Sequence, residues 1–108
     1  MKIDKVKERI KELQHYVEVY EKYEPKTMKQ MAIKLYAEFN NVSEVANVLN
    51  EKGYRKEGKL VAGKRAQVKL DSNDVTKMLN SDIEDGDQLH PIIKRVLNKN
   101  RRRKGIVV

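Results

Sequence analysis

The chain has 108 residues, a net charge of +8 at pH 7 and no cysteine. This length suits one compact domain with terminal extensions, and the lack of cysteine excludes disulfide frameworks, thiolate zinc sites and cysteine nucleophiles. No apolar run is long enough for a membrane span or a signal-peptide core, so we expect a cytoplasmic protein without a membrane partner.

The first predicted element is an amphipathic helix within residues 1–24, which Pro25 ends. Its apolar residues recur at alternating intervals of three and four, the a and d positions of almost three heptads. Either the chain's own helices or a second copy can cover such a seam. Because dimeric helix-turn-helix proteins commonly bind symmetric half-sites, a homodimer through this helix is one expectation. The seam comprises Ile3, Val6, Ile10, Leu13, Val17 and Tyr20.

Two further helices are predicted before Gly53, joined by a short turn at Asn40-Asn41. Thr27 and Gln30 have the spacing of a capping box, which starts the second helix, and Ser43 is the expected cap of the third. Apolar stripes run along both helices. They comprise Met28, Met31, Ala32, Leu35, Tyr36 and Phe39 in the second helix and Val45, Ala46, Val48 and Leu49 in the third.

The next segment, residues 53–70, is basic and contains three glycines. Six basic residues and one acid give it a net charge of +5. Its part from Lys59 to Leu70 alternates irregularly and is predicted to form a loop or a small β-wing. The basic residues are Arg55, Lys56, Lys59, Lys64, Arg65 and Lys69.

Two more helices and a tail complete the chain. Asp71 or Ser72 is the expected cap of a fourth helix that ends near Asn80-Ser81, and Pro91 suits the start of a short fifth helix. Residues 71–93 carry a net charge of −5, whereas residues 94–108 carry +7 without any acid. The basic run Arg101, Arg102, Arg103 and Lys104 is expected to be disordered in isolation and belongs to a basic tail, residues 101–108.

No residues with the spacing of a catalytic or metal site occur in the sequence. His15 and His90 have no second histidine within ligand range. The acidic turn at residues 82–87 has its glycine misplaced for a calcium loop and lacks the closing glutamate. We therefore expect a protein that is not an enzyme and has no metal, cofactor or small-molecule ligand.

The predicted fold is mainly α: a helix-turn-helix domain over residues 25–100, with a tri-helical core and a possible small β-wing. The runs Leu35-Tyr36, Val42–Arg55 and Ser72–Leu79 resemble the three helices at the DNA-binding end of serine recombinases and resolvases. That resemblance implies DNA binding without strand cleavage, because the chain has no room for the catalytic domain. The stretch from Tyr54 to Leu70 is longer than the link between second and third helices in that family.

By the same resemblance, the fourth helix is the recognition helix, which contacts base edges and phosphates through Ser72, Asn73, Thr76 and Lys77. Asp74 either accepts a hydrogen bond from a cytosine amine or caps its own helix. In the rival placement, residues 43–52 form the recognition helix and residues 59–70 a wing, but Glu44 and Glu51 would then approach phosphates.

Two concentrated basic blocks in an otherwise neutral or acidic chain favour phosphate contacts, although lysine-rich loops and tails can also serve solubility alone. The leading hypothesis is a sequence-specific binder of double-stranded DNA, either a transcriptional regulator or an accessory factor in plasmid, phage or transposon DNA transactions. The alternatives are an RNA-binding or ribosome-associated protein and a protein-interaction adaptor built on the first helix.

Overall fold

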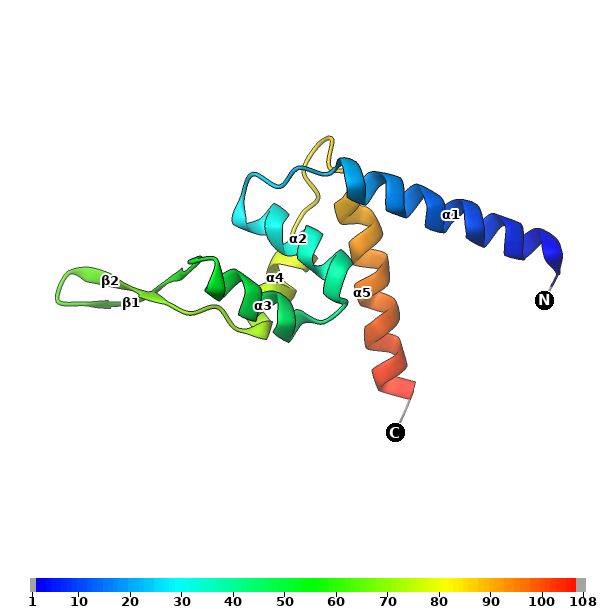
Figure 1. The fold of residues 1–108 in the computed structure, drawn as a ribbon. Helices are drawn as coiled ribbons and strands as arrows, with labels where there is room; N and C mark the ends of the chain where they lie inside the picture. The colour runs from blue at the N-terminus through cyan, green and yellow to red at the C-terminus, as the bar shows by residue number, and fades with distance from the viewer. Residues whose placement is uncertain (1, 107–108) are drawn as a thin grey trace. The chain divides into compact units, whose positions relative to one another are not determined.

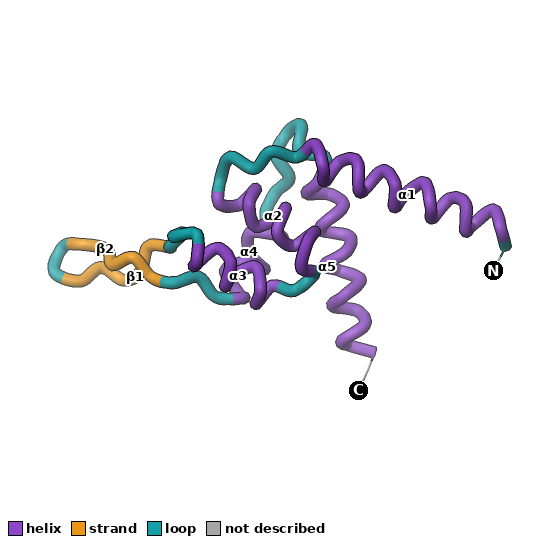
Figure 2. Tube along the Cα trace, in the orientation of Figure 1, coloured by secondary structure: helices purple, strands orange, loops and turns teal. Residues whose placement is uncertain are grey.

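The computed structural model describes residues 2–106, apart from the side chains of residues 61, 65 and 101–106. Within this range the chain is mainly helical, with one small antiparallel sheet of two strands (Figures 1 and 2). The elements are α1 (Ile3–Lys22), α2 (Met28–Phe39), α3 (Val42–Glu51), β1 (Lys56–Val61), β2 (Lys64–Val68), α4 (Ser72–Asn80) and α5 (Leu89–Ile106).

The chain divides into two compact units. The three-helix unit spans residues 25–82 and contains α2, α3, the β1–β2 hairpin and α4, whereas the two-helix unit combines residues 1–24 with residues 83–108. Residues 83–100, which we expected to belong to the helix-turn-helix domain, are thus grouped with the first helix. A tertiary hydrogen bond described below accounts for this grouping.

Apolar faces of all three helices supply the buried residues of the three-helix unit. Leu70, which lies between the hairpin and α4, is also buried, so the hairpin returns to the core before α4 begins. The predicted stripes of α2 and α3 are confirmed for most of their members, while Phe39 is exposed. The buried residues are Ala32, Ile33, Leu35, Tyr36, Val45, Ala46, Leu49, Leu70, Val75 and Leu79.

Side-chain caps fix where α2 and α3 begin. Thr27 caps α2 by accepting a hydrogen bond from the Gln30 amide at 3.1 Å, and the Gln30 side chain reaches back to the Lys26 amide rather than to that of Thr27. The predicted cap of α3 was wrong by two residues. Asn40, at φ 53°, ends α2, and the Asn41 side chain then accepts from the Ser43 and Glu44 amides. Helix α3 has therefore already begun when the chain reaches Ser43.

In the two-helix unit, the end of α1 is tied to the start of α5. The Tyr23 hydroxyl donates to Asp87 Oδ2 at 2.8 Å, while Asp87 Oδ1 accepts from the backbone amides of Leu89 and His90. Burial is the main cause that raises the pKa of Tyr23, and the hydrogen bond to this carboxylate is the second. Asp87 is therefore both the cap of α5 and its link to α1.

The structure corrects the predicted length of the fifth helix, which we had expected to be short. Helix α5 begins at Leu89, two residues before Pro91, and its backbone is helical to Ile106. It thus includes the whole basic run, residues 101–104, that we had assigned to the tail. His90 is fully buried, and Leu89, Ile93 and Leu97 form a buried stripe at intervals of four.

Candidate nucleic-acid interface

The basic segment forms a β-hairpin between α3 and α4. The strand pairs are Lys56 with Val68, Glu57 with Gln67, Leu60 with Arg65 and Val61 with Lys64. Between the second and third pairs, Gly58 and Lys59 on β1 oppose Ala66 alone on β2, which is a β-bulge. A Cβ added to Gly58 would collide with the Val68 side chain and lie 3.2 Å from the Ala66 carbonyl oxygen. Glycine at this position therefore avoids a collision with the Val68 side chain.

A two-residue turn closes this hairpin. Ala62 and Gly63 both have positive φ angles, 52° and 79°. Two successive positive angles are typical of the type I′ turn, whose twist matches that of paired strands. The turn places the Val61–Lys64 pair at the outer end of the hairpin.

Asn50 holds the two ends of the excursion between α3 and α4 together. Its side chain donates to the Leu70 carbonyl at 2.9 Å and accepts from the Leu70 amide at 2.8 Å. The Arg55 guanidinium donates to the carbonyls of Asn50 and Tyr54, at 2.9 and 2.6 Å, and so closes the carboxyl end of α3. The segment from Tyr54 to Leu70 is longer than the link in the helix-turn-helix family that the sequence resembles. Asn50 holds both of its ends.

A second anchor joins the hairpin to α4. Lys56 Nζ on β1 lies 2.7 Å from Asp74 Oδ2 in the first turn of α4. The same carboxylate accepts from the Asp71 amide, and the Asp71 side chain accepts from the Asp74 amide, which together form a capping box. Of the two caps predicted for this helix, Asp71 and Ser72, the structure has Asp71. Asp74 takes the capping role that we had weighed against a base contact.

The pKa values of the two anchoring groups reflect this bond. Partial burial would raise the pKa of Asp74, but the hydrogen bonds from Lys56 and from the Asp71 backbone outweigh it and lower that pKa. The hydrogen bond to Asp74 raises the pKa of Lys56. Both groups are therefore charged at neutral pH, and the α4 carboxylate is already neutralised within the fold.

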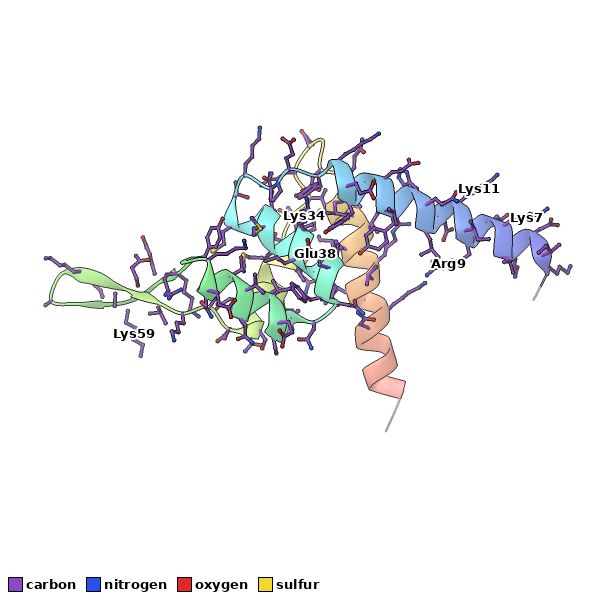
Figure 3. All side chains as sticks on the ribbon, viewed as in Figure 1. Lys7, Arg9, Lys11, Lys34, Glu38 and Lys59 are labelled. Atoms are coloured by element: carbon purple, nitrogen blue, oxygen red, sulfur yellow. The ribbon has the colours of Figure 1, made fainter. Side chains whose placement is uncertain are left out.

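Four lysines on the hairpin, on the segment that follows it and on α4 have a different environment. Each is exposed, and none of their side chains makes a hydrogen bond or ion pair within the described part of the chain. Figure 3 shows the Lys59 side chain extending away from the hairpin ribbon. These four, called the free lysines below, are Lys59, Lys64, Lys69 and Lys77.

Helix α4 exposes a polar surface opposite its buried Val75 and Leu79. Asn73, Lys77 and Asn80 are exposed and follow one another at intervals of four and three, which places them on one face. Ser72 and Thr76 are half-buried beside them, and the Thr76 hydroxyl donates to the Ser72 carbonyl at 3.0 Å. The exposed surface of α3 instead carries Glu44 and Glu51.

The predicted site residues thus divide into groups. One group, Arg55 and Lys56, is bound to partners within the fold. The second group is exposed or half-buried at the surface of the three-helix unit and comprises the free lysines, Ser72, Asn73 and Thr76. The side chains of Arg65, Arg101, Arg102, Arg103 and Lys104 lie outside the described residues. Sequence reasoning missed Asn50 and Gly58, because neither lies in a local pattern that reveals its distant partner.

Other kinds of site find little support in the residues that the structure describes. No group of three or more potential metal ligands occurs among them. None of their helices combines the length and the apolar character needed to cross a membrane.

Comparison of the chain with protein-family models, with curated proteins and with solved structures returned no match. Its function must therefore be inferred from its own residues.

Proposed function

We propose that the three-helix unit binds double-stranded DNA, with α4 in the major groove and the hairpin against the neighbouring phosphates. The observation that carries the proposal is the set of free lysines on two adjoining elements. Exposed lysines without acidic partners attract phosphates and release counterions when they bind them. Lys56, by contrast, is already bound to Asp74 within the fold.

The distribution of acids favours α4 over α3 as the groove-facing helix. Glu44 and Glu51 are exposed on α3 and would be repelled by phosphates. On α4, by contrast, Asp74 is bound to Lys56, and the Asp71 carboxylate caps the helix. The exposed face of α4 therefore has amide and ammonium groups available for DNA.

Each group has a distinct task in this proposal. Asn73 has the side chain that pairs with an adenine edge through two hydrogen bonds. Lys77 contacts guanine or a phosphate, while Lys59, Lys64 and Lys69 contact phosphates and so set affinity without reading sequence. The Asn50 and Lys56 anchors hold the hairpin at a fixed position relative to α4.

Binding to labelled duplex DNA, single-stranded DNA and structured RNA across a salt series tests the proposal, with duplex sites first selected from a random pool. Lys59→Ala/Lys64→Ala is expected to weaken binding to all duplexes and to reduce the salt slope by about 2, since each lost phosphate contact removes roughly 0.9. Asn73→Ala/Lys77→Ala is expected to reduce preference for the selected site by about 1–3 kcal/mol for each lost base contact.

Lys22→Ala/Lys26→Ala is the matched control, because it removes the same charge from exposed lysines outside the hairpin and α4. It is expected to leave the preference for the selected site unchanged and to alter the salt slope less than the hairpin variant. Tighter binding to RNA or to single strands than to duplex DNA would overturn the proposal. An equal loss of affinity in the control and the hairpin variant would also overturn it.

A further inference from the structure

Helix α1 exposes most of its heptad seam. Ile3, Ile10, Leu13 and Val17 are 65%, 48%, 45% and 53% exposed. The side of α1 that faces inward is centred on Val19, which is buried, and on the half-buried Tyr16. The two other seam residues, Val6 and Tyr20, are half-buried. An open hollow lies along the middle of this seam. It is lined by Ile10, Leu13, Gln14, Val17 and Glu18. The chain's own folding therefore leaves an apolar surface along the helix.

The charges of α1 are separated along its length. Residues 2–11 contain five basic and two acidic residues, a net charge of +3, whereas residues 12–24 contain one basic and four acidic residues, a net charge of −3. This polarity opposes the helix dipole, which favours acids at the amino end and bases at the carboxyl end. Within a single helix the arrangement is unfavourable.

The apolar seam and the charge pattern share one centre. The six seam residues are symmetric about the midpoint between residues 11 and 12, where the net charge also changes sign. When two such helices lie antiparallel about this point, Ile10 meets the partner's Leu13, Val6 meets the partner's Val17, and Ile3 meets the partner's Tyr20. Each positive half then lies along a negative half.

We propose that two copies of the chain associate through α1 as an antiparallel pair with this register. A parallel pair would align positive halves with positive halves and negative with negative, which is repulsive. Antiparallel pairing covers the exposed seam and also offsets the unfavourable dipole of each helix. The association is independent of the proposed DNA binding and is tested without DNA.

Sedimentation equilibrium of the full chain is expected to give twice the mass of one chain. Ile10→Ser/Leu13→Ser removes the central apolar layers from an exposed surface and is expected to raise the dimer dissociation constant by about tenfold or more. His15→Ser, at an exposed position off the seam, is the control and is expected to preserve the dimer. A wild-type monomer, or a dimer unaffected by the seam variant, would overturn the proposal.

Charge reversal tests the orientation. Lys5→Glu/Lys7→Glu makes the amino half negative, so an antiparallel dimer should weaken by about threefold or more, whereas a parallel dimer should strengthen. The new acids suit the amino end of a helix, so helix unfolding does not explain a weaker dimer. Adding Glu18→Lys/Glu21→Lys makes the other half positive and is expected to restore association. Strengthening by the first pair, or no restoration by the second, would refute the antiparallel arrangement.

Crosslinking tests the register, because the natural chain contains no cysteine. Lys7 and Gln14 both occupy e positions, which lie side by side only in the proposed antiparallel register. Mixed Lys7→Cys and Gln14→Cys chains are expected to join through a short bismaleimide, whereas each variant alone should crosslink poorly. Equal crosslinking of the single variants would contradict the register.

Discussion

Lys56 on the hairpin and Asp74 on α4 form an ion pair of 2.7 Å that joins the two elements carrying the free lysines. The same carboxylate belongs to the capping box of α4. One side chain therefore both starts the helix and positions the hairpin relative to it.

The Asp74 anchor makes stability depend on pH at the acid end. Because the folded state lowers the pKa of Asp74 from 3.8, its contribution is fully present above that value and is lost as pH falls through the lowered value. Asp74→Asn is expected to lower the free energy of unfolding at neutral pH and to flatten its decline in acid. Urea unfolding from neutral pH to below 3.8 measures both effects.

Lys56→Ala separates the two functions of the Asp74 carboxylate. This variant removes the ion pair but leaves the backbone bond from Asp71, so it is expected to retain part of the acid response. If Asp74→Asn declined in acid as steeply as the natural protein, Asp74 would not be the group responsible.

Asn50→Ala should destabilise the three-helix unit, because it removes both hydrogen bonds to buried Leu70. A buried amide left without a partner costs about 1–3 kcal/mol, and such a loss lowers the melting temperature by several degrees for each kcal/mol. Thermal unfolding gives the change. Asn47→Ala, at an exposed position of the same helix, is the control and should melt within about 0.5 kcal/mol of the natural protein.

The β-bulge predicts a size-dependent effect at Gly58. Gly58→Ala places a methyl group against the Val68 side chain and is expected to destabilise the hairpin by on the order of 1–3 kcal/mol. Val68→Ala removes the colliding group, so the double variant should recover much of the loss. Hydrogen exchange of the hairpin amides measures this local stability. A double variant no better than Gly58→Ala would show that the collision is not the cause.

Much of the helical structure followed from the sequence because its signals are local. A heptad seam and Pro25 defined α1, the Thr27 hydroxyl marked the start of α2, and Asp71 marked the start of α4. Each signal acts between residues within one or two turns, so spacing alone reveals it. The cap of α3 was misplaced because Asn41 and Ser43 are both good caps, and the choice depended on where Asn40 ended α2.

Only the tertiary structure decided how these elements are joined. Asn50 meets Leu70 across 20 residues and Tyr23 meets Asp87 across 64, and no local periodicity encodes either pairing. The first bond returns the hairpin to the end of α3, and the second groups α5 with α1. The sequence alone determined where charge is concentrated, but the fold decided which basic side chains have partners, because Lys56 finds the carboxylate of Asp74, 18 residues away, only when the hairpin and α4 are folded together.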